Sequence, residues 1–267
     1  MRQPLLFLGI VPSLDYHKNM DSTPKISIVI ASYNSAATIE RALLSVERQE
    51  LKDWECLVID GASTDGTVAI AQSFAARDER FRVYSEPDQG VYDAFNKGWR
   101  KARGEFIHYL GSDDELLPEG LKILADNSDD VDYVYGGVWV RFRSGRKKLQ
   151  VPRVLEEVAP KYSATCHQGV IMRRSLIEKL GGFDLEYKVI ADCELTIHGF
   201  MEGMRTRRIP VPIAIFNIGG MSTDSLPGLK DKCKILRKYG FSEWTIRRYY
   251  VWHYIKRLLT LIKHRFD

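Results

Sequence analysis

Short runs of apolar, β-branched residues alternate with amphipathic segments along the first half of the chain. The apolar runs have the length and composition of buried strands. The expected strands cover residues 26–31, 54–60, 81–85 and 106–110; the helices between them are one that carries Ile39, Leu43, Leu44 and Val46, and two at about 67–76 and 91–103. This alternation predicts right-handed crossovers and a doubly wound, mostly parallel α/β sheet. The carboxyl ends of the four strands then lie along one edge, where such sheets bind ligands.

The second half of the chain has a less regular pattern. The expected strands cover residues 133–142, 148–152, 169–172 and 207–216, with a turn at 181–184 and a helix at about 191–202. Pro210 and Pro212 place the last of these strands at an edge, because proline cannot donate a ladder hydrogen bond. We expect this half to complete the same domain and to supply an acceptor site.

Composition and charge divide the chain into three segments. The apolar stretch 5–14 is short and interrupted by Pro12, so residues 1–24 are interpreted as a flexible leader before a domain at 25–225. Residues 226–267 are expected to form a basic amphipathic helical tail, which has eleven Lys or Arg and three acids from Lys230 onward, although the whole chain is only +4. Such asymmetry indicates an anionic surface partner for the tail alone. The four cysteines are widely spaced, which favours free thiols in a reducing cytosol.

Side chains suited to binding a nucleotide follow each of the first four strands. They are Ser32, Tyr33 and Asn34 after the first, Asp60 and Ser63 after the second, Asp88, Gly90, Asn96 and Lys97 after the third, and Ser112, Asp113 and Asp114 after the fourth. Acids at this edge suit hydrogen bonds to a base and a ribose, and a metal that bridges phosphates. Tyr33 offers a face for stacking, while Lys97 and the helix N-terminus near Gly90 offset phosphate charge.

The adjacent carboxylates Asp113 and Asp114 have two interpretations of about equal weight when taken alone. Two acids repel each other unless a cation lies beside them, which favours a divalent metal that carries phosphate oxygens. The alternative is a capped turn before the next helix, with either acid as the N-cap and Pro118 near the first turn. The presence of Asp60 and Asp88 on the same edge favours the metal.

Other residues also have plainer interpretations. Asn34 suits a turn, Asp65 an N-cap, Lys97 a solvated helix face, and Tyr92 and Phe95 the core. The chain has no Walker loop, no GxGxxG after the first strand and no serine nucleophile elbow. These absences disfavour a P-loop site, a dinucleotide site of the Rossmann type and a serine hydrolase.

The chain resembles glycosyltransferase family 2, which has the GT-A fold, over about residues 26–222. The segments that carry the resemblance are IVIASYN at 28–34, VIDGASTDGT at 58–67, EPDQGVYDAFNKG at 86–98, GSDD at 111–114, HQ at 167–168, GGFD at 181–184, ADCEL at 191–195 and GGMS at 219–222. Each segment is weak alone, but their order and spacing are similar to those of the family. The block at 86–98 resembles the branch that builds bacterial polysaccharides.

The resemblance implies roles for three acids. Asp114 matches the metal-binding acid of a DxD-type motif, and Asp113 matches the neighbouring acid that contacts the ribose or supports the metal. Asp192 matches the catalytic base; its plainer role is to complement a helix dipole. His167 is a candidate contact for phosphate or acceptor, or a buried histidine with a satisfied hydrogen bond. Glu194 is the next candidate if Asp192 is not the base.

Three positions depart from the family pattern. Ser112 replaces the first acid of the DxD, so the metal would depend on Asp114 together with water and diphosphate. Gly61 replaces an acid that often binds uracil, so either Asp60 takes this role or base recognition is altered. Ala191 replaces the usual Glu before the base.

The function that the resemblance implies is an inverting transfer of one sugar, a hexose or an N-acetylhexosamine, from a nucleotide-sugar, usually UDP-linked, with Mn²⁺ or Mg²⁺ as cofactor. The acceptor would be a hydroxyl of a glycan or a lipid-linked molecule in cell-surface polysaccharide synthesis. Such a displacement needs a carboxylate to take the acceptor proton and a cation to stabilise the departing diphosphate.

Three other functions remain open from the sequence. A nucleotidyltransferase uses a similar fold, but it usually has a Gly/Lys/Arg-rich loop after the first strand, where this chain has Ser32–Ala36. An inactive GT-A scaffold is disfavoured by the retention of Asp114 and Asp192. A nucleic-acid-binding protein is disfavoured by the acidic body and by the absence of a recognition module.

The basic tail predicts a long amphipathic helix, from Glu243 to about His264, capped by Ser242. Its apolar face would carry Trp244, Val251, Trp252, Ile255, Leu258, Leu259, Ile262 and Phe266, with Lys256, Arg257, Lys263 and His264 roughly opposite and Arg248 within the apolar face. A basic amphipathic helix with Trp is typical of an interfacial membrane segment. The alternative, nearly equal, is a helix that packs on the domain or on another subunit. We expect peripheral association with the cytoplasmic face of a membrane.

Overall fold

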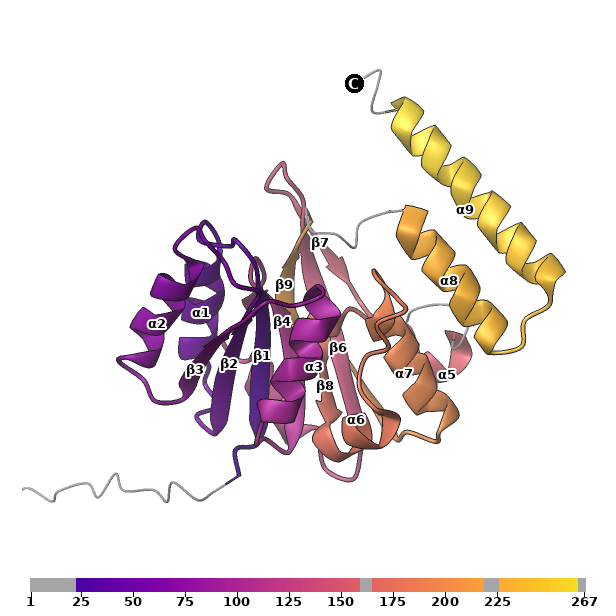
Figure 1. Cartoon of the computed structure of the whole chain (residues 1–267). Helices are drawn as coiled ribbons and strands as arrows, with labels where there is room; N and C mark the ends of the chain where they lie inside the picture. The colour runs from indigo at the N-terminus through magenta and orange to yellow at the C-terminus, as the bar shows by residue number, and fades with distance from the viewer. Residues whose placement is uncertain (1–22, 159–164, 219–225, 264–267) are drawn as a thin grey trace, which may run out of the picture.

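The computed structural model describes residues 23–158, 165–218 and 226–263. Within these residues one sheet has the strand order β3-β2-β1-β4-β8-β6-β9-β5, and β7 pairs with β6 (Figure 1). The strands are β1 (Ile26–Ser32), β2 (Trp54–Asp60), β3 (Phe81–Ser85), β4 (Phe106–Gly111), β5 (Glu115–Leu116), β6 (Tyr133–Arg141), β7 (Lys147–Gln150), β8 (Val170–Arg173) and β9 (Thr206–Asn217). The helices are α1 (Ile39–Glu47), α2 (Thr67–Ala75), α3 (Val91–Lys101), α4 (Gly120–Asp126), α5 (Leu155–Val158), the 3₁₀ turn η1 (His167–Gly169), α6 (Arg174–Leu180), α7 (Ala191–Met201), α8 (Leu226–Lys238) and α9 (Glu243–Lys263).

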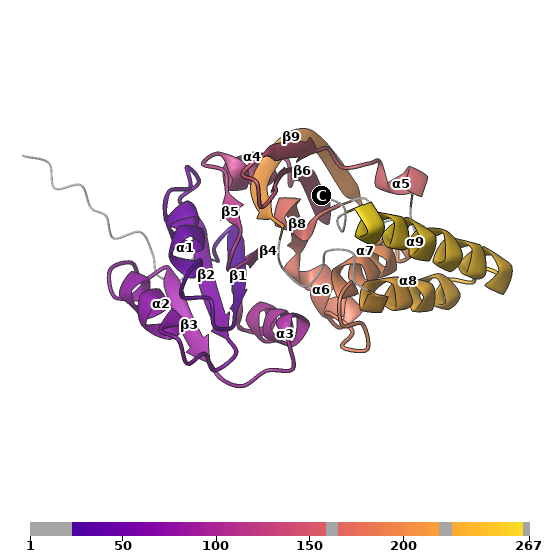
Figure 2. The same ribbon diagram turned by 90° about the horizontal axis from the view of Figure 1, so that it is seen from above.

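The first half confirms the predicted parallel sheet. Strands β1 to β4 begin at the expected residues and run parallel, in the order β3-β2-β1-β4. Helices α1 and α2 cover one face and α3 covers the other (Figure 2). Apolar side chains fill both layers, which is why β1 and β2 are buried almost throughout. Gly98 lets α3 approach β1 closely, since a Cβ there would lie 2.2 Å from Cγ1 of Val29.

The second half adds a mixed part to the sheet. Strand β8 pairs antiparallel with β4, β6 pairs antiparallel with β8, and β9 runs parallel to β6. The register between β6 and β9 shifts around Gly137, opposite the segment that carries Pro210 and Pro212. The prolines therefore lie at an irregularity of the β6–β9 pairing. Among the described residues, the other edge of β9 pairs with a strand only where β5 meets Ala214 and Ile215. Strand β5, helices α5 and α6 and the turn η1 had no counterpart among the expected elements; α8 lies in the helical tail expected at 226–267, in which bounds were predicted only for the helix that corresponds to α9.

The basic tail separates into two helices with different surroundings. In α8, Ile235 and Leu236 are completely buried, and Asp231 accepts a hydrogen bond from the backbone N–H of Val189 at 3.0 Å. Helix α9 lies outside α8 (Figure 1), and Ser242 caps it, as predicted, by accepting from the N–H of Thr245 at 3.3 Å. None of the helices in the described residues combines the length and apolarity that a bilayer crossing requires. The four cysteines are free thiols.

Candidate active site

The carboxyl ends of the first four strands meet at one edge of the sheet, as predicted. Strand pairing sets Ser32 opposite Asp60 and Asp60 opposite Ser85, while Ala31 faces Gly111. The loops that follow these strands therefore converge on one side of the sheet, where a ligand can contact several of them at once.

Asp60 is fully buried at this edge and binds only neighbouring protein groups. Its carboxylate accepts hydrogen bonds from the hydroxyls of Ser32 (3.1 Å), Ser63 (2.5 Å) and Ser85 (2.8 Å) and from the N–H of Ser63 (2.8 Å). Four such bonds occupy most of the acceptor capacity of a carboxylate. In this structure Asp60 joins the ends of β1, β2 and β3 and presents no surface to solvent or to a ligand.

The loops after β1 and β2 are held together by hydrogen bonds. The N–H of Asn34 donates to Ser63 Oγ at 2.8 Å, and Asn34 Oδ1 accepts from the N–H of Thr64 at 3.0 Å. Asn34 has a φ of 46°, a left-handed conformation that Asn tolerates better than most residues. Asp65 fixes the same loops, since its carboxylate accepts from Ala36 and Thr67. The Tyr33 ring stands out from this junction with 66% of its surface exposed.

The carboxylate of Asp88 lies directly over Gly61. A Cβ on Gly61 would be 2.7 Å from Asp88 Oδ2 and 3.3 Å from Cδ2 of Tyr33, so the acid and the aromatic ring share the space that a side chain at 61 would fill. Asp88 is itself oriented by the N–H of Gly90, which donates to Oδ1 at 2.8 Å. An exposed ring beside a carboxylate with one free oxygen is suited to stacking on a base and accepting an N–H from its edge.

Asn96 and Lys97 both donate hydrogen bonds to backbone carbonyls of neighbouring segments. Asn96 is buried; its amide donates to the carbonyl of Phe183 at 2.8 Å and accepts from Phe183 and Trp99. The Lys97 ammonium donates to the carbonyl of Pro87 at 2.6 Å and forms ion pairs with Glu86 and Asp93. Both residues therefore fix α3 against the segments beside it.

The turn after β4 brings Asp113 and Asp114 to the same edge. Asp114 is only 2% exposed, and its two oxygens accept from the N–H of Asn217 and from Gln168 Nε2, each at 2.8 Å. Ser112 donates to the hydroxyl of Ser35 at 2.8 Å. The alternative of a helix cap is wrong, because β5 follows the turn and α4 begins only at Gly120, with Glu119 as its N-cap.

The negative charges of Asp113 and Asp114 are not fully balanced by neighbouring positive groups. Burial, followed by the neighbouring charge of Asp113, raises the pKa of Asp114 to about 6. Arg41 and Arg141 form their ion pairs with Glu115 instead, at 3.0 and 2.6 Å. A divalent cation fits this charge, because hard cations take carboxylate oxygens. No three His, Cys, Asp or Glu side chains gather as a metal site within the described residues, so a cation at the pair would take its other ligands from water and a bound diphosphate.

Asp192 lies at the start of α7, held from two sides. Its Oδ1 is 3.0 Å from the Tyr92 hydroxyl, and its Oδ2 is 3.2 Å from His167 Nδ1. The Tyr92 hydroxyl also donates to the carbonyl of Val189 at 2.6 Å. The Asp192 side chain keeps 27% of its surface exposed, so a substrate can reach it.

The pairing of Asp192 and His167 favours their charged forms. Burial opposes ionisation of Asp192, but the hydrogen bonds and charge of His167, with the bond from Tyr92, hold the pKa of Asp192 below its usual value. Burial also lowers the pKa of His167, but the bond and charge of Asp192, with further charge from Asp114 and Asp113, raise that pKa overall. Asp192 is therefore ionised at neutral pH, which a general base requires.

Two consecutive residues connect the two acid sites: His167 bonds to Asp192, and Gln168 bonds to Asp114. Because neighbouring Cα atoms are about 3.8 Å apart, this His167–Gln168 bridge keeps the two carboxylates in one small part of the site, where His167 feels the charge of both. The sequence predicts for His167 either a contact with phosphate or acceptor or a buried histidine with a satisfied hydrogen bond, and it indicates no role for Gln168 or Asn217. It placed Tyr92 in the core, and no local signal indicates a bond to a residue 100 positions away.

Glu194 does not share this space. It is 1% exposed and binds the Lys238 ammonium at 2.7 Å and the Tyr239 hydroxyl at 3.0 Å, so it holds α7 to α8. Of the two acids that begin α7, only Asp192 faces the acid pair through the His167–Gln168 bridge.

Known proteins with similar sequences include glycosyltransferases. The sequence model of "Glycosyl transferase family 2" matches residues 27–226. A "PGL/p-HBAD biosynthesis glycosyltransferase" of Mycobacterium tuberculosis is 35% identical over 211 residues, which are 75% of this chain and 80% of that protein. A "Putative glycosyltransferase EpsH" of Bacillus subtilis is 34% identical over 128 residues, covering 48% of this chain and 37% of that one.

Similar solved structures share the fold at low sequence identity. Staphylococcus aureus TarS 1-349 in complex with UDP-GlcNAc has a TM-score of 0.65 at 21% identity and covers 80% of this chain and 65% of that one. The mannosyltransferase PcManGT from Pyrobaculum calidifontis, in complex with GDP-Man and Mn²⁺, has a TM-score of 0.62 at 19% identity and covers 82% and 65%. These two structures support the predicted α/β GT-A fold, with a mixed, mostly parallel sheet and C-terminal helices.

The family match covers the converging loops, the acid pair at Asp113 and Asp114, and Asp192. It favours sugar transfer over the nucleotidyl transfer that the sequence left open. The chain therefore belongs to glycosyltransferase family 2 and is an enzyme that transfers a sugar from a nucleotide-sugar.

Proposed function

We propose that this chain is an inverting, metal-dependent transferase that takes one sugar from a UDP-sugar and attaches it to a hydroxyl of a glycan or a lipid-linked acceptor. The observation that carries the proposal is the His167–Gln168 bridge, which connects an ionised, partly exposed Asp192 with the buried Asp114 of the acid pair. An inverting displacement needs this combination: a base on the acceptor side and stabilised negative charge on the leaving-group side.

In the proposed reaction the acceptor oxygen attacks the anomeric carbon while the bond to the diphosphate breaks. Asp192 takes the proton of the acceptor hydroxyl, and His167 and Tyr92 hold the carboxylate in position. Asp113 and Asp114 would hold Mn²⁺ or Mg²⁺, which supplies positive charge for the departing diphosphate. Gln168 and the N–H of Asn217 orient Asp114 for this role.

Nucleotide-sugars assayed with and without Mn²⁺ test the proposal directly. We expect one UDP-sugar to raise the melting temperature in the presence of Mn²⁺ and to release UDP when acceptor is added, with both effects removed by a chelator. GDP- and CDP-sugars serve as matched controls. If no UDP-sugar in the panel binds, the proposed donor is wrong. If binding is the same with chelator, the proposed metal is wrong.

We assign base recognition to Asp88 and Tyr33, with Asp60 as their support. Asp88→Asn removes a charged acceptor for the uracil N3–H but keeps the Oδ1 that binds Gly90. We expect UDP affinity to fall about tenfold or more, since a hydrogen bond to a charged group contributes about 1.5–3 kcal/mol. Calorimetry with UDP and with its 3-methyl analogue measures the effect. An Asp88→Asn protein that still prefers UDP over the methylated analogue as strongly as the native chain removes Asp88 from this role.

His167 is proposed to position Asp192 and lower its pKa. His167→Phe keeps a ring beside Phe95, 5.9 Å away in the native chain, but removes the Nδ1 hydrogen bond. The pKa of Asp192 then rises, so the base stays protonated to a higher pH. We expect the acidic limb of the kcat profile to move up by about one pH unit or more, with donor affinity unchanged. A uniform loss at every pH contradicts this role, and Tyr92→Phe should give a shift in the same direction.

A further inference from the structure

Helix α9 packs on α8 through one side only. Ile246, on the inner side, is 3% exposed, and Tyr249, Tyr250 and His253 are partly covered. The Tyr249 and His253 rings stack with their centroids 4.0 Å apart, and His253 Nδ1 lies 2.9 Å from the carbonyl of Tyr249. This polar and aromatic side, rather than the most apolar one, is the side that meets the rest of the chain.

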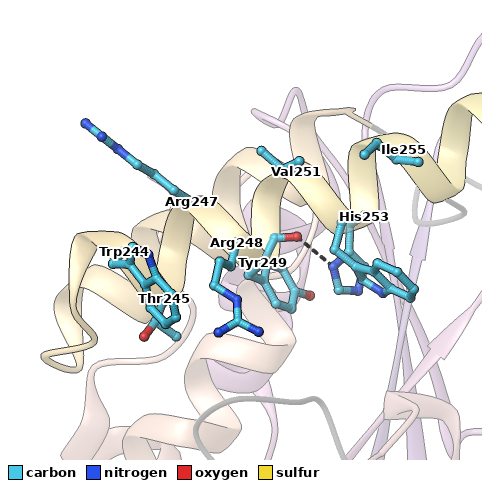
Figure 3. A pocket seen from close by; sticks show the side chains of 9 residues that line it. Trp244, Thr245, Arg247, Arg248, Tyr249, Val251, His253 and Ile255 are labelled. Carbon is cyan, nitrogen blue, oxygen red and sulfur yellow. Dashed lines mark hydrogen bonds between the residues drawn. The ribbon is translucent and has the colours of Figure 1, made fainter.

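The apolar side of α9 faces outward. Its large side chains are exposed: Trp244 (66%), Trp252 (66%), Val251 (53%), Ile255 (48%) and Tyr254 (39%). Figure 3 shows side chains that line a hollow of about 800 Å³ along this helix; they include Tyr249 and His253 of the inner side as well as Trp244 and Val251 of the outer side. Every residue that lines it belongs to α9, so no second element in the described part of the chain closes over it. The expected alternative, in which the apolar face packs on the domain, is therefore not what these residues do.

The same surface is cationic. Arg247 and Arg248 are exposed, and the Arg248 guanidinium lies over the Trp244 ring, 4.4 Å from its centroid. The one acid in α9, Glu243, is already bound to Arg237 at 2.6 and 3.0 Å. The five cations of this 21-residue helix thus lack an acid of the same helix to balance them.

We propose that the outward face of α9 binds an anionic lipid surface, with Trp244, Val251, Trp252 and Ile255 at the boundary between headgroups and acyl chains and the arginines on lipid phosphates. Tryptophan suits this boundary because its ring is apolar and its N–H is polar. Arginine can lay its stem along apolar surface while its charge stays among the headgroups. An anionic leaflet supplies the negative charge that the helix lacks, which places the protein at the cytoplasmic face of a membrane.

A second copy of the chain fits this face less well. Two α9 helices packed through their apolar sides would bring Arg247 and Arg248 of both copies into one interface without a free carboxylate between them. Unpaired charges removed from water are strongly unfavourable. The proposal does not depend on the donor, the metal or the base, and its experiment can fail while transferase activity remains.

Vesicle flotation of the full chain tests the proposal. The probes are phosphatidylcholine vesicles with and without phosphatidylglycerol, at low and high salt. We expect the native chain to float with the anionic vesicles at low salt and to be released by salt. Replacing Trp244, Trp252 and Ile255 together by Gln should lower the partition coefficient about tenfold or more. The double variant Arg247→Gln with Arg248→Gln should lower the partition coefficient about fivefold for each charge removed.

The chain offers matched controls for both variants. Val151, Met201 and Val211 are exposed by 41%, 56% and 39% on other elements, so their replacement by Gln changes apolar surface elsewhere. Arg48→Gln with Lys52→Gln removes two exposed charges near the end of α1. UDP affinity and light-scattering mass are measured for every protein. The proposal is overturned if the native chain does not float with the vesicles, or if the controls lose flotation equally. It is also overturned if the native chain is a dimer that the triple variant converts to a monomer.

Discussion

Replacing Asp192 by Asn is expected to lower kcat by about 10²- to 10⁴-fold, the range that positioned proton transfer contributes. Asn has nearly the same shape and can still bond to Tyr92 and His167, but it cannot take a proton from the acceptor. Donor affinity should be unchanged, because the acid pair and the base-binding loops lie elsewhere. Single-turnover transfer and UDP calorimetry measure the two effects separately.

The control for this experiment is the neighbouring acid of α7. Glu194→Gln weakens the contacts with Lys238 and Tyr239, so its effect should appear in the free energy of unfolding rather than in kcat. Near-normal turnover in the Asp192→Asn protein would remove the base assignment. If the native chain binds a UDP-sugar but transfers nothing to any acceptor, the inactive scaffold becomes the better interpretation.

Replacing Asp114 by Asn is expected to abolish the effect of Mn²⁺ on UDP binding. Coupling between two bound ligands typically changes the affinity for each by about 5- to 150-fold. We expect Mn²⁺ to give no such gain in UDP affinity in the Asp114→Asn protein. The Gln168 amide can turn to present its oxygen to the new Asn, so the fold should survive. In the native chain the proton competes with the metal, and the gain should therefore shrink as the pH falls through about 6, the pKa of Asp114.

Calorimetry of UDP with Mn²⁺ and with chelator gives the measurement. Asp65→Asn is the matched control, because Asp65 is an acid of the same edge whose carboxylate binds only Ala36 and Thr67. A Mn²⁺ effect that survives in the Asp114→Asn protein, or that is lost equally in the control, contradicts the metal assignment.

The parallel half of the sheet could be predicted almost to the residue, whereas the second half could not. A parallel strand covered on both faces is a continuous apolar run, so β1 to β4 have a strong local signal. Strand β5 is only two residues long and exists because Glu115 and Leu116 pair with a strand about a hundred positions later. Helix α8 contains five cations, and the sequence shows a basic tail where the structure buries Ile235 and Leu236.

In the candidate site, too, the features that are local in the sequence could be predicted, and the contacts between distant residues could not. Acids at strand ends are visible in the sequence, but the partners that decide their roles come from elsewhere. Three serines, at the ends of β1 and β3 and in the loop after β2, make Asp60 a structural residue, and a glycine at 61 leaves room for Asp88. In α9 the sequence predicted the two faces, but only the structure gives the face that meets α8.

The Tyr92 hydroxyl has one proton and two acceptors, Asp192 Oδ1 at 3.0 Å and the Val189 carbonyl at 2.6 Å. Burial, followed by the charge of Asp192, raises the pKa of Tyr92 well above its usual value, so the phenol keeps that proton. While Asp192 is ionised, the two oxygens compete for a single hydrogen. Once Asp192 has taken a proton from the acceptor, it can donate to the phenol oxygen, and the phenol can donate fully to Val189. The competition in the resting enzyme thus becomes a directed chain of hydrogen bonds, so Tyr92 and Val189 hold the carboxyl of Asp192 in place after the transfer step as well as before it.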